Sequence, residues 1–161
     1  MRELPADPDH RVVVHTDGAA RGNPGPAGIG AVLTDTDGNV LAEHAEGIGP
    51  ATNNVAEYRA AIAGLRLAAD HGAGQVLLRA DSRLLIEQLA GRFRVKNPTL
   101  QRLHTEARAL MKDFDRVDLE HVPRERNKAA DLLANEGLEA WLLTPDGEAY
   151  RPPGPPPSLL D

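Results

Sequence analysis

The sequence contains no cysteine, and only 3% of its residues are aromatic. Without cysteine the chain can form neither disulfides nor cysteine-ligated zinc or iron–sulfur sites, and this composition suits a reducing cytoplasm. No apolar run approaches the roughly 18 residues of a membrane-spanning helix, and the polar segment 1–10 does not have the pattern of a signal peptide. We therefore expect a cytoplasmic protein with no membrane partner. We also expect it to be a monomer.

The 161 residues fit a single domain, and 41% of them are hydrophobic, which is enough for a core built of Val, Leu, Ile and Ala. Residues 1–10 are expected to be a disordered leader. Residues 144–161 contain six of the thirteen prolines and are expected to form an extended tail. The folded and catalytic part is thus predicted to be residues 11–143.

The net charge of −6 argues against a nucleic-acid partner, because phosphate binding usually needs a basic surface. The charge is uneven, however: the stretch 79–112 holds eight Arg or Lys residues against three acids. A solvated helix face would explain this stretch equally well. It supports nucleic-acid binding only if it lies beside a catalytic site.

Short apolar or β-branched runs and the turns between them predict an α/β fold. Strands are predicted over 11–16, 29–35, 40–48, 75–81 and 116–122, and helices over 53–71, 82–91, 98–112 and 126–141. The first three strands are joined by short turns, which favours an antiparallel meander. Strands and helices then alternate, which predicts a mixed sheet covered by helices.

Two acids stand at the ends of apolar strands. Asp17 and Asp81 each follow such a run, and adjacent strand ends would bring the two carboxylates together at the edge of the sheet where ligands bind. Such a pair is costly unless a cation or a shared proton relieves the repulsion. Each acid could instead be a turn or helix-capping residue. Glu57 also suits the first turns of a helix, and Asp131 a helix face, so no single acid identifies a site.

Four segments, in order, resemble the signatures of type 1 ribonuclease H. They are TDGAARGNPGPAGIG, TNNVAEYRA, ADSRLLIEQL and VPRERNKAADLLAN, and the resemblance covers nearly all of residues 11–140. It implies the ribonuclease H-like fold: a five-stranded mixed sheet flanked by helices, with strands 1–3 as an antiparallel meander and strands 4 and 5 parallel to strand 1. It also implies that the family's four metal-binding carboxylates are Asp17, Glu57, Asp81 and Asp131.

The resemblance further implies an endoribonuclease that cuts the RNA strand of RNA/DNA hybrids and leaves 5′-phosphate and 3′-hydroxyl ends. Two Mg²⁺ ions, for which Mn²⁺ can substitute, would serve this chemistry. Asp17 would bridge both ions, with Glu57 and Asp81 on one and Asp131 on the other. Many members carry a mobile histidine before the last Asp; here the loop has Arg124, to which we assign an auxiliary catalytic role. A plain surface position is the alternative for Arg124, and His121 is expected to be a partly buried strand residue.

By the same resemblance, a set of mostly neutral polar residues would contact the duplex. The backbone at Gly22 with Asn23 and Asn53 would meet the RNA hydroxyls in the minor groove, since the 2′-hydroxyl distinguishes RNA from DNA. Asn54 would lie near the DNA strand and Thr52 would hold a DNA phosphate. Arg83 would touch the RNA backbone. Asn53 or Asn54 could instead cap the helix that begins there.

The segment 91–97 is short where many members insert a basic, aromatic helix that grips the DNA strand. Arg92, Phe93, Arg94 and Lys96 are expected to be a reduced substitute, with Arg94 and Lys96 as substrate contacts. Members without the insertion can also accept RNA/RNA duplexes. Two alternatives stay open: another nuclease of the same superfold that acts on DNA, and a catalytically silent nucleic-acid-binding module.

Overall fold

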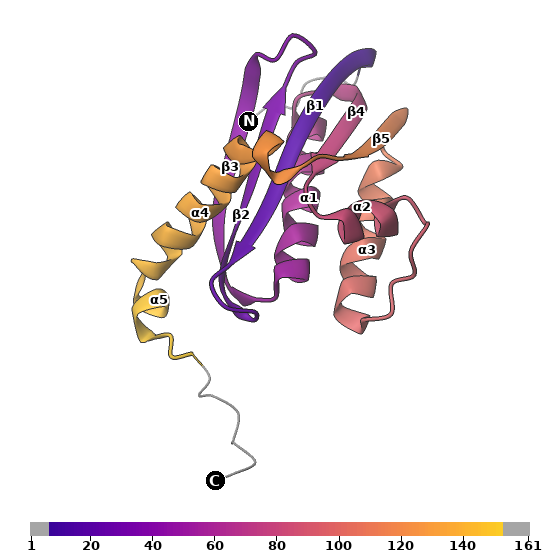
Figure 1. Cartoon of the computed structure of the whole chain (residues 1–161). Coiled ribbons are helices and arrows are strands. Elements are labelled where there is room, and N and C mark those ends of the chain that lie inside the picture. The colour runs from indigo at the N-terminus through magenta and orange to yellow at the C-terminus, as the bar shows by residue number, and fades with distance from the viewer. Residues whose placement is uncertain (1–6, 153–161) are drawn as a thin grey trace.

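The computed structural model of the chain describes residues 7–152, and residues 1–6 and 153–161 lie outside the described part (Figure 1). Five strands form one sheet in the order β3-β2-β1-β4-β5. The strands are β1 (Asp7–Ala20), β2 (Gly25–Thr34), β3 (Val40–Ala51), β4 (Ala73–Ala80) and β5 (Arg116–His121). β2 pairs antiparallel with β1 and β3, whereas β4 pairs parallel with β1 and β5. The predicted mixed sheet, with its meander and its two parallel strands, is confirmed.

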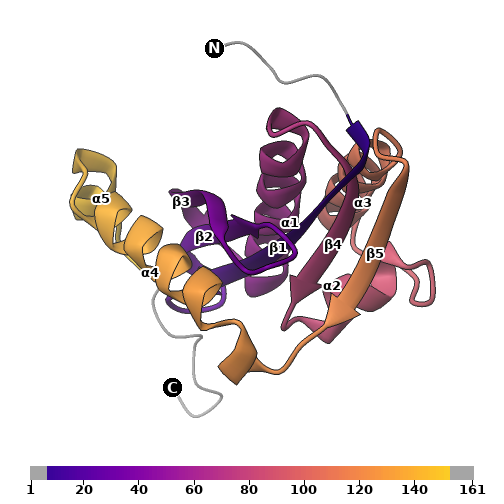
Figure 2. The same ribbon diagram turned by 90° about the horizontal axis from the view of Figure 1, so that it is seen from above.

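Helices cover both faces of this sheet (Figure 2). One face carries α1 (Asn53–Asp70), with α2 (Arg83–Leu89) and α3 (Pro98–Met111) beside it, and the other carries α4 (Lys128–Leu142), which packs on β2 and β3. A 3₁₀ turn, η1 (Arg124–Arg126), precedes α4, and the short α5 (Pro145–Ala149) follows it. No helix within residues 7–152 is long and apolar enough to cross a membrane.

The first strand is longer at both ends than its β-branched run predicts. It begins at Asp7, inside the segment that was expected to be a disordered leader, and it continues to Ala20. The prediction that Asp17 follows the strand is therefore wrong: Asp17 lies within β1 and pairs with Gly30 of β2. Pairing with β2 supplies the backbone partners that Gly and Ala, which have little strand preference of their own, need in order to extend the strand.

The tail is also more ordered at its start than its proline content predicts. Residues of the expected extended segment form α5, whose first turn is capped by Thr144 through a hydrogen bond from the Gly147 N–H. The rings of Trp141 and Tyr150 meet edge-on, with centroids 6.2 Å apart, and tie α5 to the end of α4. The predicted tail beyond residue 152 lies outside the described part of the chain.

The main core lies between the sheet and α1, α2 and α3. Aliphatic side chains such as Val14, Leu65 and Leu78 fill it, in keeping with the scarcity of aromatic residues. On the other face, glycines allow α4 to approach β2 closely. A Cβ at Gly30 would lie 2.3 Å from Ala130 O, and a Cβ at Gly28 would lie 2.0 Å from Ala134 O. This approach brings the start of α4 over the middle of the sheet.

Candidate active site

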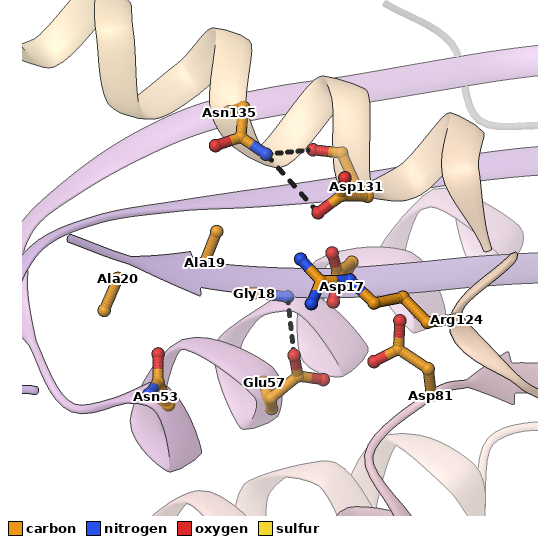
Figure 3. A pocket seen from close by; sticks show the side chains of 10 residues that line it. All are labelled: Asp17, Gly18, Ala19, Ala20, Asn53, Glu57, Asp81, Arg124, Asp131 and Asn135. Atoms are coloured by element: carbon orange, nitrogen blue, oxygen red, sulfur yellow. Dashed lines mark hydrogen bonds between the residues drawn. The ribbon is translucent and has the colours of Figure 1, made fainter. Parts of the chain in front are cut away.

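Four acidic residues from four different elements line one hollow of about 360 Å³ (Figure 3). Asp17 comes from β1, Glu57 from α1, Asp81 from the residue after β4 and Asp131 from the first turn of α4. The first three offer carboxylate oxygens that all lie within 4.8 Å of one another. The structure thus brings together the four carboxylates that the resemblance selects, at the carboxyl end of β4 where parallel sheets place ligand sites.

A glycine explains how Glu57 reaches Asp17. A Cβ at Gly18 would lie 2.3 Å from the carbonyl carbon of Ala56, so only glycine lets the first turns of α1 contact β1 here. The Gly18 N–H then donates to Glu57 Oε1 at 3.0 Å. The local sequence Asp17-Gly18 therefore supplies both the first carboxylate and the space for the second.

The helices next to the hollow are capped by residues other than the expected ones. Thr52, rather than Asn53 or Asn54, caps α1, because its Oγ1 accepts from the Val55 N–H at 3.2 Å. Ser82, rather than Asp81, caps α2 in the same way through the Leu85 N–H. The simpler explanation, in which Asn53, Asn54 or Asp81 serves only as a helix cap, is wrong for all three.

Burial makes the acidic cluster electrostatically costly. Asp17 is 5% exposed and Glu57 8% exposed. Burial, followed by the neighbouring Glu57 and Asp81 carboxylates, raises the pKa of Asp17 to about 10. Burial likewise raises the pKa of Glu57 to about 7, although its bonds with Asp17 and the Gly18 N–H oppose the rise. Glu57 Oε2 is buried without a hydrogen-bond partner among the described residues. Clustered hard oxygen donors with an unpaired buried oxygen fit a divalent cation such as Mg²⁺.

Two asparagines that the sequence analysis did not select hold these carboxylates. Asn127, 1% exposed, donates from Nδ2 to Thr16 O at 2.9 Å and to Asp81 Oδ2 at 3.3 Å. Asn135 donates to the Asp131 backbone oxygen at 2.9 Å and to Asp131 Oδ1 at 3.3 Å. Asn127 and Asn135 stand four residues before and after Asp131, a helical spacing that is visible in the sequence but does not reveal what they contact.

Arg124 lines the hollow, and His121 contacts the backbone of one of its acids. Arg124 lies on η1, and its exposed side chain reaches into the hollow beside Asp17 (Figure 3). His121 was expected to be partly buried, and that is wrong: it is exposed because β5 is the edge strand and His121 is its last residue. Its ring Nε2 lies 3.2 Å from Asp81 O.

Among the neutral polar residues expected to contact a duplex, Asn53 lies at the acidic hollow and the other asparagines and Thr52 lie at a second one. Asn53 lines the acidic hollow, and its N–H donates to Asn23 Oδ1 at 3.0 Å. Gly22 occupies the β1–β2 turn with φ at 90°. A second hollow, of about 300 Å³, is lined by Asn23, Thr52, Asn54, Val55, Asn97, Thr99 and Leu100. The sequence analysis does not select Asn97 or Thr99, because it assigns Pro98 only as a helix start; in the structure Asn97 caps α3.

The basic residues expected to contact substrate lie outside these two hollows. Arg83 is the exposed first residue of α2. Arg94 and Lys96 are exposed in the segment between α2 and α3, and Arg94 lines a third hollow of about 530 Å³ together with Phe93. The basic stretch of the sequence thus runs from the acidic site along α2 to this segment.

Comparison with known proteins identifies the family. A family model described as reverse transcriptase-like matches residues 15–137. The bifunctional protein Rv2228c of Mycobacterium tuberculosis is 51% identical over 131 residues, which are 81% of this chain and 36% of that protein. A ribonuclease HI of Halobacterium salinarum is 50% identical over 129 residues, 80% of this chain and 65% of its own. A ribonuclease HI of Caulobacter vibrioides is 36% identical over 143 residues, 80% of this chain and 93% of its own. The chain therefore spans 36% of Rv2228c, 65% of the Halobacterium protein and 93% of the Caulobacter protein.

Solved structures agree with the fold. The N-terminal RNase H domain of Rv2228c superposes with a TM-score of 0.80 at 50% identity and covers 82% of this chain and 96% of that one. LC11-RNase H1, solved in complex with an RNA/DNA hybrid, superposes with a TM-score of 0.78 at 41% identity and covers 81% and 99%.

Proposed function

The chain belongs to the type 1 ribonuclease H family, and from that premise we propose that it hydrolyses the RNA strand of RNA/DNA hybrids. The observation that carries the proposal is the acidic cluster: Asp17, Glu57 and Asp81 offer oxygens within 4.8 Å of one another, and Glu57 Oε2 is buried without a described partner. A relative 41% identical, LC11-RNase H1, was solved with such a hybrid, which supports the same substrate class here.

We propose Mg²⁺ as the cofactor, in two ions, with Mn²⁺ able to replace it. Asp17, Glu57 and Asp81 would hold one ion, and Asp17 with Asp131 the other. When bound, the metal would lower the pKa of a water molecule and offset the charge of the phosphate and of the leaving 3′-oxygen, which gives 5′-phosphate and 3′-hydroxyl products.

The residues around the carboxylates have separate proposed tasks. Asn127 keeps the Asp81 carboxylate turned towards Asp17, and Asn135 does the same for Asp131. Arg124 is the exposed cation of the hollow, and its guanidinium can donate two parallel hydrogen bonds to phosphate oxygens. We propose that it orients the scissile phosphate and takes the place of the histidine of other members.

The same hollow and its neighbour would receive the two strands. Asn53 lines the carboxylate hollow, and its N–H donates to Asn23 of the Gly22–Asn23 turn. We propose that Asn53 and this turn donate to and accept from ribose 2′-hydroxyls, which distinguish RNA from DNA. Thr52 and Asn54 line the second hollow, where we place a phosphate of the DNA strand, with Asn97 as an added contact. Arg83 would contact the RNA backbone.

One cleavage assay tests this function against both alternatives. The chain is incubated with labelled RNA/DNA hybrid, double-stranded DNA and double-stranded RNA, in Mg²⁺, Mn²⁺ or EDTA. We expect cleavage of the hybrid in either metal and none in EDTA, and weaker cleavage of the RNA/RNA duplex, since the large basic insertion is absent. Cleavage of DNA alone would favour a DNA-acting nuclease of the same superfold, and binding without cleavage would favour a silent binding module.

Several further features are proposals of the same kind. We propose residues 11–143 as the catalytic unit, together with the start of β1 at Asp7–His10 and with α5. We propose a monomeric enzyme of the cytoplasm. Light scattering with size-exclusion chromatography tests the monomer, and cell fractionation tests the location.

A further inference from the structure

The segment between α2 and α3, residues 91–97, lies beside the proposed DNA-strand hollow but has no regular secondary structure of its own at residues 94–96. It carries three cations. Arg92 is committed to Glu87 through two hydrogen bonds, of 2.6 and 3.0 Å. Arg94 and Lys96 pair with no carboxylate within residues 7–152, so their charges remain available to phosphates.

Two glutamine side chains hold the backbone of this segment. Gln88 Nε2 donates to Arg94 O at 3.0 Å, and Gln101 Nε2 donates to Val95 O at 2.9 Å. A segment without strand or helix partners would otherwise leave these carbonyls to solvent and its side chains without a fixed direction. The glutamines therefore fix the backbone position from which the Arg94 and Lys96 side chains extend.

Gln88 is an unusual residue for its position. The buried residues of α2 are Leu85, Ile86, Gln88 and Leu89, so Gln88 is the polar one among them, and it is 5% exposed. An amide in such a place costs free energy unless its hydrogen bonds are satisfied. Both ends of the amide are satisfied: Oε1 accepts from the Tyr58 hydroxyl at 2.6 Å, and Nε2 holds Arg94 O.

Tyr58 connects this network to the catalytic carboxylates. It is 1% exposed and follows Glu57 directly on α1. Its hydroxyl donates a hydrogen bond to Gln88 Oε1. Two hydrogen bonds thus run from the helix that carries Glu57 to the segment that carries Arg94 and Lys96.

We propose that Gln88, held by the Tyr58 hydroxyl, is a positioning residue that fixes Arg94 and Lys96 against the backbone of the uncut strand of the duplex. The inference rests on the proposed function. The uncut strand is favoured because Asn97, at the end of the same segment, lines the hollow of Thr52 and Asn54. The network would then set the spacing between the cutting site on one strand and the phosphate contacts on the other.

The test compares two variants. Gln88→Met keeps the side-chain volume but removes both hydrogen bonds of the amide, and Tyr58→Phe removes only the hydroxyl. Either variant should raise KM for hybrid cleavage about 3- to 10-fold and leave kcat unchanged, since the cations remain but lose their direction. The slope of log KM against log salt concentration should become shallower by about 1 to 2, the contribution of one or two phosphate contacts. Val12→Ala, a substitution in the buried core on β1, is the control for a simple loss of stability.

A thermodynamic cycle decides whether Gln88 acts through the cations. In a chain that already carries Arg94→Ala and Lys96→Ala, Gln88→Met should change KM no further. A full additional rise in KM, a fall in kcat instead, or an equal rise in the Val12→Ala control would overturn the positioning role. The same variants are compared by fluorescence anisotropy with an uncut hybrid in EDTA. If the wild-type chain cleaves no hybrid, the proposed function fails, and the fold-changes in Kd alone decide the role of Gln88.

Discussion

Replacing Asp17 by asparagine should stabilise the metal-free chain while it abolishes cleavage. Asp17 is buried beside Glu57 and Asp81, and its pKa rises from 3.8 to about 10. Each pKa unit corresponds to about 1.4 kcal/mol, so at pH 7 the folded chain forgoes up to about 4 kcal/mol relative to an unperturbed carboxyl. The asparagine amide needs partners in the same buried place, which offsets about half of that gain. The net stabilisation is about 2 kcal/mol, or roughly 4–8 °C in Tm for a domain of this size.

The pH dependence gives this prediction its sign. The folded pKa values of Asp17 and Glu57 lie above the unfolded values of 3.8 and 4.5. Their contribution to stability is therefore fully present below about pH 4 and is lost as the pH rises through about 7 for Glu57 and about 10 for Asp17. The advantage of Asp17→Asn should accordingly be small at pH 4 and grow up to pH 8.

The assay is calorimetric or fluorescence-monitored thermal unfolding in EDTA at pH 4, 6 and 8, with hybrid cleavage measured in parallel. Asp113→Asn, at an exposed acid outside the cluster, is the matched control and should leave both Tm and activity unchanged. Mg²⁺ should raise the Tm of the wild-type chain at pH 8 more than that of Asp17→Asn, since the cation replaces the missing charge balance. An unchanged or lower Tm for Asp17→Asn, or a gain that does not grow with pH, would refute the electrostatic account of the cluster.

Three other predictions address the surroundings of the cluster. Asn127→Ala should raise the Mg²⁺ concentration needed for half-maximal activity about 10- to 100-fold, because the Asp81 carboxylate loses its hydrogen-bond donor. Titration of activity against Mg²⁺ measures this midpoint, and an unchanged midpoint would contradict the prediction. Arg124→Ala should lower kcat/KM by about 10-fold or more, and Arg124→Lys should lower it less, since lysine keeps the charge without the paired donors. Equal activity of the wild type and both variants would exclude a phosphate contact. Gly30→Ala should lower the free energy of unfolding by about 2–4 kcal/mol, because its Cβ would lie 2.3 Å from Ala130 O. Gly38→Ala, which has open space around it but a φ of 91°, should lower it by about 1 kcal/mol. Denaturant titration compares the two variants.

Local sequence patterns predict much of the fold. The apolar and β-branched runs at Arg11–Thr16 and Gln75–Ala80 are strands in the structure. Pro98 begins α3, and Gly91, with a positive φ, follows the end of α2, as the conformational preferences of proline and glycine predict. These features depend on neighbours along the chain. The ends of β1 do not: Gly18–Ala20 are strand because β2 lies beside them, and Asp7 is strand because it pairs with Ala73 of β4.

The candidate site divides in the same way. The order of the four signature segments was enough to select Asp17, Glu57, Asp81 and Asp131, although each acid alone suited an ordinary structural role. Thr52 shows the limit of such patterns, because three adjacent polar residues could each have capped α1 and only the backbone geometry shows which one does. The sequence likewise gave no reason to expect an exposed His121, which follows from the position of β5 at the sheet edge.

Short runs of residues are sufficient to identify the family, the order of the elements and the four acids of the candidate site. What holds those acids, and what lies beside them, depends on how the sheet and helices pack. Asn127 is 111 residues from Thr16, whose carbonyl it contacts, and Tyr58 is 30 residues from Gln88. Contacts across such separations depend on how the sheet and helices pack, and no local pattern of residues encodes them.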